Sequence, residues 1–227
     1  MTNLEDTEKA AAARKSLEYV KDGMVVGLGT GSTATFAIHF LGQQVREGLK
    51  IRGIPTSRAS AELARSLMIP LTSFDEVDYT DVTIDGADEV APGLALIKGG
   101  GGALLHEKIV AAASRHLVIV ADEHKLVQHL GRFPLPVEVI PFAAGPVKKK
   151  LAELGANPIL RLAHDGSPYI TDEGNHIFDC HYGEILDPHA VAQTLKSITG
   201  IVEHGLFLGL ASVAVVAGPN GARVIQG

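Results

Sequence analysis

Two short segments combine glycine with charged side chains of the types used in acid–base chemistry. Asp85 and Asp88 lie three residues apart in DGADE, so their carboxylates can converge on one small site. In KGGGGALLHEK, Lys98 precedes four consecutive glycines and Glu107 follows them. Four glycines are costly in backbone entropy and make sense where backbone must line a ligand. The pattern suits a site for a small ligand, into which Glu107 could point. Taken alone, a turn with solvated acids and a flexible loop before a charged helix explain these segments more simply.

A third glycine-rich loop, GLGTGST at 27–33, lies between a predicted strand and a predicted helix. A helix N-terminus offers unpaired N–H groups and partial positive charge to an anion, and Thr30, Ser32 and Thr33 add hydroxyl donors. The alternative is a plain turn in which Ser32 or Thr33 caps the helix. Ser32 stands where a dinucleotide fingerprint has its third glycine, and no Gly-Lys-Ser/Thr follows. A small phosphorylated ligand therefore fits better than NAD or ATP.

Further polar groups follow other predicted strands. If these strands form one parallel sheet, the groups lie at the same edge of it as the glycine loop. Lys125 follows an apolar strand in the segment DEHK, where it could reach a phosphate or remain a solvated surface lysine. Thr56 and Ser57 end the second strand, where the dinucleotide fingerprint would require an acid. The N-cap of the following helix is the simpler explanation of those two residues.

Other catalytic and metal-dependent chemistries are not favoured. The acids at 85–88 and the pair His106 and Glu107 could compete as metal ligands, but they lack a tight ligand spacing, so we expect no metal. Cys180 lacks a catalytic signature, and no Gly-x-Ser-x-Gly nucleophile elbow occurs. As the single cysteine it cannot form an internal disulfide, which favours a reducing compartment.

Composition narrows the class of protein further. The 227 residues are 46% hydrophobic and 20% charged, which is ordinary for a globular protein. Lys and Arg number 20 against 26 Asp and Glu, so the net charge is −6 and no binding to nucleic acid or an anionic membrane is expected. The start, MTNLEDTEKA, does not have the pattern of a signal peptide, and the longest apolar run, 206–218, is too short to span a bilayer. We expect a soluble, cytoplasmic protein.

The elements that must position the charged residues alternate between strand and helix. An apolar run at 24–28, the glycine turn, a helix at 34–47 and a strand at 50–54 form a βαβ unit, which implies a parallel sheet. The continued alternation predicts a doubly wound α/β domain with ligands at the carboxyl ends of its strands. Further helices are expected at 7–21, 59–68 and 103–115, and further strands at 81–85, 94–98 and 117–121.

The composition of the chain changes at the start of its second half. Four prolines between 134 and 146 mark a domain joint. The order beyond it is strand, helix, strand, strand, helix, strand, which is that of a ferredoxin-like unit. The tail, with a Gly-Pro-Asn-Gly turn, is expected to return to the first sheet as a hairpin. We expect a catalytic domain over 1–132 plus 209–227 and an inserted domain over 133–208. The predicted elements of the inserted domain are strands at 137–140, 159–162, 176–181 and 202–208 and helices at 147–154 and 189–198.

Four motifs in order give the sequence a family resemblance. GLGTGSTA (27–34), DGADE (85–89), KGGGGALLHEK (98–108) and PLPVEVIP (134–141) resemble ribose-5-phosphate isomerase, type A, and the later EILDP (184–188) extends the resemblance over nearly the whole chain. It implies an α/β fold, a Rossmann-like doubly wound and mostly parallel sheet with an inserted ferredoxin-like α+β domain. It also implies a homodimer or a dimer of dimers, and no metal or other cofactor.

The activity that the resemblance implies is an aldose–ketose isomerase acting on a small sugar phosphate. Such an enzyme interconverts D-ribose 5-phosphate and D-ribulose 5-phosphate through an enediolate, in the non-oxidative pentose phosphate pathway. The rivals are another phosphosugar isomerase and a sugar-phosphate sensor domain. A sensor would keep the phosphate loop without needing Glu107, but it would normally carry a DNA-binding or partner module, for which this chain has no spare length.

The resemblance also assigns residues. Glu107 is expected to carry the proton between C1 and C2, and Lys98 with the N–H groups of the glycine run is expected to stabilise the oxygen that gains charge. Asp85 is expected to open the sugar ring and Asp88 to hold hydroxyls. The substrate-binding positions are Thr30, Gly31, Ser32, Thr33, Asp85, Gly86, Ala87, Asp88, Lys98, Gly99, Gly100, Gly101 and Lys125.

Two positions match the family less clearly. Lys9 is a weak match to an N-terminal lysine that binds substrate. His106 stands where some members have arginine, so the sequence does not decide whether either residue contacts phosphate.

Overall fold

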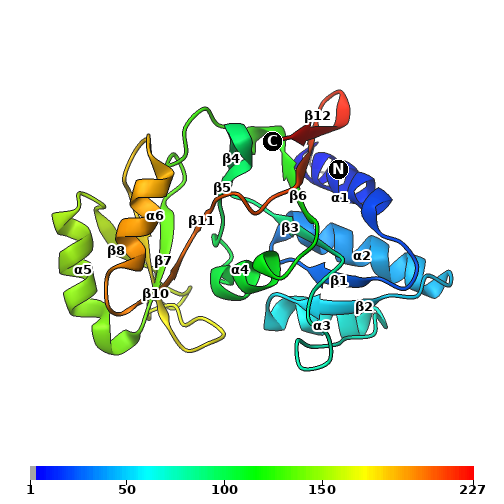
Figure 1. The fold of residues 1–227 in the computed structure, drawn as a ribbon, viewed down its shortest axis with the longest axis horizontal. Helices are drawn as coiled ribbons and strands as arrows, with labels where there is room; N and C mark the ends of the chain where they lie inside the picture. Colours follow the sequence, from blue (N-terminus) through cyan, green and yellow to red (C-terminus); the bar gives the residue numbers. More distant parts are fainter. Residues whose placement is uncertain (1–3) are drawn as a thin grey trace.

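The computed structural model describes residues 4–227, and its largest element is a six-stranded sheet (Figure 1). The strand order is β13-β12-β6-β3-β1-β2, with every neighbouring pair parallel except the antiparallel edge hairpin β12–β13. This arrangement confirms the predicted doubly wound sheet and the returning hairpin. The strands are β1 Val25–Leu28, β2 Arg52–Pro55, β3 Val82–Gly86, β6 Leu117–Asp122, β12 Val213–Gly218 and β13 Gly221–Gln226.

Strand order reverses at β1. The chain proceeds from β1 outward to β2, then crosses to β3 on the other side of β1 and continues to β6. In open parallel sheets the carboxyl ends of the strands at such a switch point leave a crevice in which ligands bind. The loops after β1 and β3 carry the first glycine loop and DGADE, so the fold brings two of the motifs together.

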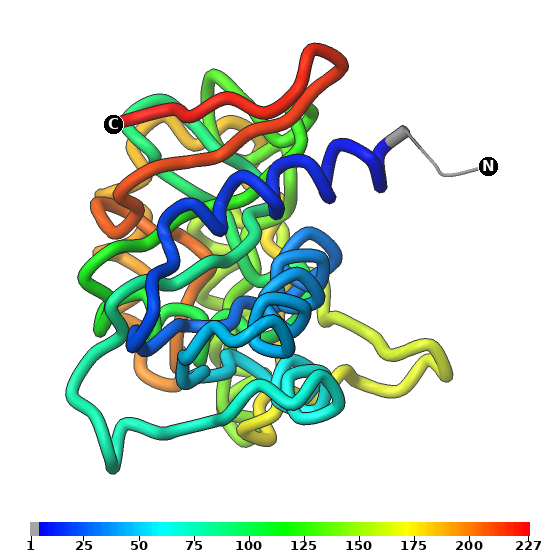
Figure 2. Tube along the Cα trace, turned by 90° about the vertical axis from the view of Figure 1, so that its right-hand side faces the viewer, coloured from blue at the N-terminus to red at the C-terminus, as the bar shows by residue number. Residues whose placement is uncertain are grey.

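Four helices belong to the part of the chain that forms this sheet. Figure 2 shows α1 running beside the C-terminal hairpin, and α1 contacts both β12 and β13. The described part of α1 ends at Ser16 and a short 3₁₀ helix, Leu17–Tyr19, follows, so the predicted continuous helix to residue 21 is wrong. The helices are α1 Leu4–Ser16, α2 Ser32–Arg46, α3 Arg58–Ser66 and α4 Leu104–Ala112.

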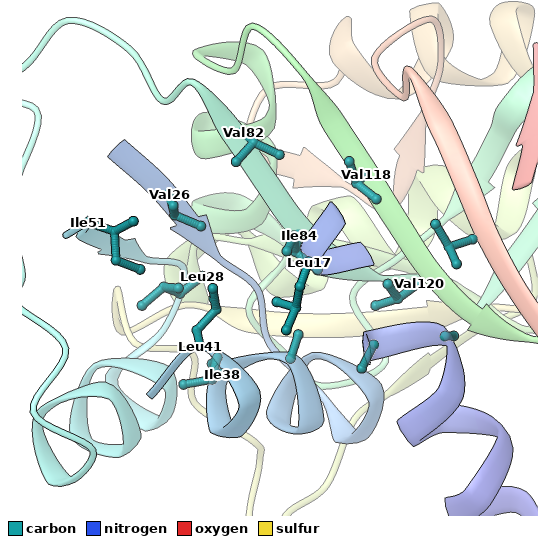
Figure 3. Close-up of a cluster of buried hydrophobic side chains, with 14 of the residues drawn as sticks. Leu17, Val26, Leu28, Ile38, Leu41, Ile51, Val82, Ile84, Val118 and Val120 are labelled. Carbon is teal, nitrogen blue, oxygen red and sulfur yellow. The ribbon is translucent and has the colours of Figure 1, made fainter. Parts of the chain in front are cut away.

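The central strands of the sheet are buried on both faces, as parallel strands in an α/β domain require. Along β6, Val118 and Val120 belong to a cluster packed under α1 and α2 (Figure 3), while Leu117 and Ile119 belong to a second cluster on the opposite face. Alternation of side chains along a strand explains this division. Burial on both faces makes β6 a continuous apolar run and holds the strand ends that carry polar residues in fixed places.

A four-stranded antiparallel sheet lies beside the first (Figure 1). Its order is β10-β7-β9-β8, and the chain forms it as strand, helix, strand, strand, helix, strand, which confirms the ferredoxin-like order. The boundaries 1–132, 133–208 and 209–227 stay a prediction, and we propose them as the division between two domains. The elements are β7 Leu135–Val139, α5 Ala144–Glu153, β8 Pro158–Leu160, β9 His176–Cys180, α6 Pro188–Lys196 and β10 Ile201–His204.

A small third sheet, β11-β5-β4, connects the two larger ones. The predicted single strand over 202–208 is wrong, because Gly205 separates β10 from β11 and the two pair with different sheets. Gly205 donates to Pro136 O and accepts from Lys98 N–H, and a Cβ there would lie 2.3 Å from Lys98 O. Strand β4 was not predicted. The strands are β4 Glu89–Ala91, β5 Ala95–Ile97 and β11 Leu206–Phe207.

Helix α4 contacts both large sheets, through β3 on one side and β7 and β10 on the other. It therefore presents its first turn at the junction between them. Among the described residues, no helix is long and apolar enough to cross a bilayer.

Candidate active site

A cavity opens at the switch point, with about 470 Å³ of empty space including its mouth. The loops after β1, β3, β5 and β6 and the first turn of α4 converge on it, with one residue from α1. The cavity is lined by Lys9, Thr30, Gly31, Ser32, Thr33, Gly86, Ala87, Asp88, Lys98, Gly99, Gly100, Gly101, Glu107 and Lys125.

One end of the cavity is built to hold an anion. Gly31 is the N-cap of α2, so the N–H groups of the first turn, including those of Ser32 and Thr33, lack partners within the helix and carry the positive end of its dipole. Lys125, from the 3₁₀ helix after β6, and Lys9, from α1, add ammonium groups. Positive charge is thus concentrated in the cavity lining, as an anionic ligand requires of a chain whose net charge is −6.

Thr30 is held by the strand end beside it. Its hydroxyl lies 2.8 Å from the hydroxyls of both Thr56 and Ser57. Ser57 also accepts from Ser60 N–H and caps α3, which confirms the N-cap interpretation. Thr56 and Ser57 therefore hold the Thr30 side chain in place, although neither of them lines the cavity.

Asp85 lies beneath the cavity floor rather than in its wall. It is 0% exposed, and its Oδ1 accepts hydrogen bonds from Thr30 N–H at 3.1 Å and Gly86 N–H at 2.8 Å. A Cβ on Gly29 would lie 2.3 Å from this oxygen, so glycine is required for the loop to close over the carboxylate. Asp85 is the one predicted site residue that does not line the cavity.

Lys98 connects Asp85 with the reactive end of the cavity. Its Nζ lies 3.0 Å from Asp85 Oδ2, 3.4 Å from Glu107 Oε2 and 2.5 Å from Gly86 O. Both Lys98 and Glu107 are buried, at 2% and 3% exposure, yet both reach the cavity wall. One ammonium thus lies between two carboxylates at a place that a small ligand can reach.

The proton affinities of this group follow from its surplus of negative charge. Burial disfavours the Lys98 ammonium, but Asp85 and Glu107 outweigh burial and raise the pKa of Lys98. Burial, together with Asp85 and Asp88, raises the pKa of Glu107 to about 8 against the opposing effect of Lys98. Each carboxylate has one buried oxygen without a hydrogen-bond partner, Asp85 Oδ2 and Glu107 Oε2, and burial raises the pKa of Asp85 as well. Of these two carboxylates only Glu107 lines the cavity, so Glu107 is the one that can exchange a proton with a bound ligand.

The glycine run and Asp88 form the wall between the two ends. Gly100 N–H donates to Asp88 Oδ2 at 2.7 Å, which turns the Asp88 side chain against the run. Gly101 lies near Thr30, since a Cβ on this glycine would be 3.6 Å from the Thr30 methyl carbon. The backbone of the glycine run thus extends from the Lys98 and Glu107 side of the cavity to the loop that contains Thr30.

Several other candidates lie elsewhere. His106 does not line this cavity, and its Nε2 lies 2.8 Å from Glu173 Oε1 of the second sheet's domain. Cys180 is buried in the core of that domain, and burial raises the pKa of its thiol to about 12. Within residues 4–227, no group of three or more His, Cys, Asp and Glu side chains could hold a metal ion.

Sequence reasoning gave Lys9 only a weak match and missed Arg161 altogether. Lys9 is only 11% exposed, lines the cavity and pairs with Glu5. Arg161, just after β8, bonds the carbonyls of Gly99 and Gly100. No local pattern in the sequence marks Arg161, because its contacts are about sixty residues away.

Comparisons with known proteins agree with this geometry. The family model described as ribose 5-phosphate isomerase A (phosphoriboisomerase A) matches residues 52–221. A relative from Nitrobacter hamburgensis named ribose-5-phosphate isomerase A is 52% identical over 97% of this chain and 98% of its own length. One from Bradyrhizobium diazoefficiens with the same name is 50% identical over 99% of this chain and 97% of its own.

Solved structures are similar over the whole chain. That of ribose 5-phosphate isomerase A from Methanocaldococcus jannaschii has a TM-score of 0.94 and 41% identity, covering 98% of this chain and 100% of its own. A D-ribose-5-phosphate isomerase in complex with phospho-erythronic acid has a TM-score of 0.96 and 39% identity, with both chains fully covered. The predicted α/β fold with its Rossmann-like sheet is therefore confirmed.

Proposed function

The chain belongs to the ribose 5-phosphate isomerase A family and interconverts ribose 5-phosphate and ribulose 5-phosphate, and we propose that Glu107 carries the proton between the reacting carbons. The observation that supports this role is the position of Glu107, buried but facing a cavity beside Lys98. The opposite end of the same cavity is suited to a phosphate.

The phosphate anchors the substrate at the N-terminus of α2. A phosphate group carries about two negative charges near pH 7, which the helix dipole, Lys9 and Lys125 offset. Thr30, Ser32 and Thr33 supply further donors. Binding energy gained at this end orients the reacting carbons at the other.

Ring opening precedes isomerisation, because the aldose is mostly a closed ring. A proton must leave the O1 hydroxyl while another reaches the ring oxygen. Asp85 lies beneath the floor, so we propose that it acts through Lys98, which it holds at 3.0 Å and which lines the cavity. Lys98 gives a proton to the ring oxygen and takes the O1 proton in return, so its ammonium is restored. Asp88, in the cavity wall, accepts from the sugar hydroxyls.

Isomerisation then moves one proton between carbons and one between oxygens. Glu107, as carboxylate, takes the proton from C2 of the open aldose, which leaves an enediolate. Glu107 returns that proton to C1, while the O2 proton passes to O1, so the aldehyde becomes a hydroxymethyl group and C2 becomes the ketone. Such general base catalysis contributes about 10²–10⁴-fold.

Lys98 and the glycine run stabilise the charge that develops on O1 and O2. The Lys98 pKa is raised by its carboxylate neighbours, so the ammonium keeps its charge at neutral pH. One fixed donor of this kind contributes about 10²–10³-fold. The site thus offers a base for carbon, a cation for oxygen and an anchor for phosphate.

We also propose that the protein is a cytoplasmic homo-oligomer. The family resemblance supports the oligomer, and so do large apolar side chains exposed on the second domain, among them Phe142 at 97% and Leu186 at 74%. The single cysteine, buried and unpaired, supports a reducing compartment.

A direct assay of ribulose 5-phosphate formation by the purified protein, with EDTA present, tests the proposed function. The proposed steps use only groups of this chain, so we expect full activity with the chelator. Activity that is lost on chelation and restored by a divalent ion would contradict the mechanism.

A further inference from the structure

The glycine run of the active site is held from outside by the second domain. Arg161 lies between β8 and β9, and its Nη1 donates to Gly99 O at 2.9 Å and Gly100 O at 3.2 Å. The other side of the guanidinium forms a two-point contact with Asp179 of β9, including Nε to Oδ2 at 3.0 Å. A guanidinium fixed in this way cannot rotate freely, so it holds both carbonyls in one orientation.

The orientation of these carbonyls determines where the next N–H groups point. Peptide bonds of residues 4–227 are all trans, and in a trans peptide the C=O and the following N–H point to opposite sides. Arg161 and the Gly102 N–H both donate to the Gly99 carbonyl, and the Gly100 N–H, on the other side of that peptide, donates to Asp88. The same reasoning turns Gly101 N–H toward the cavity, because Arg161 also holds the Gly100 carbonyl.

Gly101 N–H has no hydrogen-bond acceptor among the described residues, although Gly101 lines the cavity. Tyr169 supports the same segment, with its hydroxyl 3.5 Å from Gly101 O and its ring 5.9 Å from the Arg161 guanidinium. The run therefore presents one N–H that fixes Asp88 and a second that is open to a ligand oxygen.

We propose that Arg161 is a positioning residue for isomerisation, which orients the glycine run so that Gly100 N–H fixes Asp88 and Gly101 N–H donates to a sugar oxygen. This inference rests on the proposed function. Arg161 does not line the cavity and touches neither Lys9 nor Lys125, so its effect is on the sugar carbons rather than on phosphate binding.

The test compares Arg161→Ala with Arg58→Ala. Arg58 is a matched control, because it also joins the two domains, by donating to Asp172 O at 2.9 Å, but does not touch the glycine run. We expect Arg161→Ala to lower kcat about 10–100-fold and to weaken inhibition by phospho-erythronic acid about tenfold. Inhibition by inorganic phosphate should change less than about threefold, and Arg58→Ala should keep kcat within about twofold.

Two further measurements keep the proposal open to contradiction. Guanidinium ion at millimolar concentration should restore part of the kcat of Arg161→Ala and leave Arg58→Ala unchanged. If Arg161→Ala does not fold, Arg161→Lys and Asp179→Asn replace it, and each should lower kcat at least about fivefold with an unchanged melting temperature.

Three results would overturn the proposal: a kcat within twofold of wild type, equal losses in Arg161→Ala and Arg58→Ala, or phosphate inhibition that weakens in parallel with kcat. A failure of the proposed role of Glu107 would be recognised separately. In that case Glu107→Gln would remain active, whatever the kcat values of Arg161→Ala and Arg58→Ala.

Discussion

Two lysines, one buried and one half-buried, lie against the ring of Phe207, and their surroundings give them opposite properties. Lys98 Nζ is 5.4 Å from the ring centroid and Lys108 Nζ is 4.8 Å from it. Lys98 has two carboxylates within 3.4 Å, those of Asp85 and Glu107. Lys108 shares one carboxylate, that of Glu203, with another lysine. The first group has a surplus of negative charge and the second a surplus of positive charge.

In the second group, the carboxylate of Glu203 is already paired with two lysines. Burial opposes ionisation of Glu203, but Lys108 and Lys196 outweigh it and lower the pKa of Glu203 to about 2. Burial lowers the pKa of Lys108 to about 8, and burial with Lys108 lowers the pKa of His204 to about 4. Lys108 also donates to His204 O, which ties α4 to β10. This group braces two domains and has no carboxylate free to take a proton at neutral pH.

The comparison shows that burial alone does not create a catalytic base. Glu107 and Glu203 are both buried beside lysine, yet the pKa of Glu107 is raised to about 8 and that of Glu203 is lowered to about 2. The sign depends on which charge is in excess nearby. A general base works best when its pKa lies near the operating pH, and only Glu107 meets that condition.

Replacing each lysine with methionine should separate the two groups most sharply. Lys98→Met removes the ammonium that contacts both Asp85 and Glu107, so we expect kcat/KM to fall at least about 10²–10³-fold. Lys108→Met leaves Glu203 paired with Lys196 and should cost about 1–3 kcal/mol of stability with kcat within a few-fold. Steady-state kinetics and urea unfolding measure the two effects. Similar kinetic losses in both variants would refute the distinction.

Stability against pH should change in opposite directions for the two glutamates. The folded-state pKa of Glu107, about 8, exceeds its ordinary value of 4.5, so ionisation favours the unfolded chain as pH rises from about 4.5 to 8. Glu107→Gln lacks that penalty and should become more stable than wild type across this range, by at most about 5 kcal/mol above pH 8.

Glu203→Gln is the matched control for that measurement. Because the folded-state pKa of Glu203 is lowered to about 2, ionised Glu203 stabilises the fold above pH 4.5, and this contribution is lost as pH falls toward 2. Glu203→Gln should therefore be less stable than wild type at neutral pH. Urea unfolding at pH 5 and pH 8.5 gives the comparison. If the gain in unfolding free energy of Glu107→Gln over wild type does not grow with pH, the pKa of Glu107 is not raised in the folded protein.

Lys125→Ala should have a smaller effect, confined to binding. Lys125 lines the cavity, and we propose that it binds the phosphate, so we expect KM for ribose 5-phosphate to rise about tenfold and kcat to change less. Lys150→Ala, on exposed α5, is the control and should match wild type. An unchanged KM in Lys125→Ala would remove Lys125 from the phosphate site.

Much of the site could be predicted because its residues occupy strand ends that the sequence marks. Glycine loops after apolar runs indicated where Thr30, Asp88, Lys98 and Glu107 would meet, since parallel strands end at one edge of the sheet. The burial of Asp85 could not be predicted in the same way. It depends on how closely the first loop folds over the end of β3, which is a matter of packing rather than of residue type.

The other features that could not be predicted depend on contacts between distant parts of the chain. The division of one apolar run into β10 and β11 depends on Gly205, whose neighbours include Lys98 and Pro136. Arg161 is a plain arginine after a short strand, and only the packing of the two domains gives it a partner in the glycine run. Periodicity and local motifs do not contain such information.

The most direct test of the account is the reaction of Glu107→Gln with ribose 5-phosphate in D₂O, followed by NMR. Wild type should form ribulose 5-phosphate with some solvent deuterium at C1, because the carboxylate can exchange its proton before returning it. Gln keeps the size of the side chain but cannot accept a proton from carbon, so the variant should bind phospho-erythronic acid and show a rate at least about 10²-fold lower, with no exchange. Turnover and deuterium incorporation near the wild-type level in Glu107→Gln would contradict the account, and the base would then have to be Asp85 or Asp88.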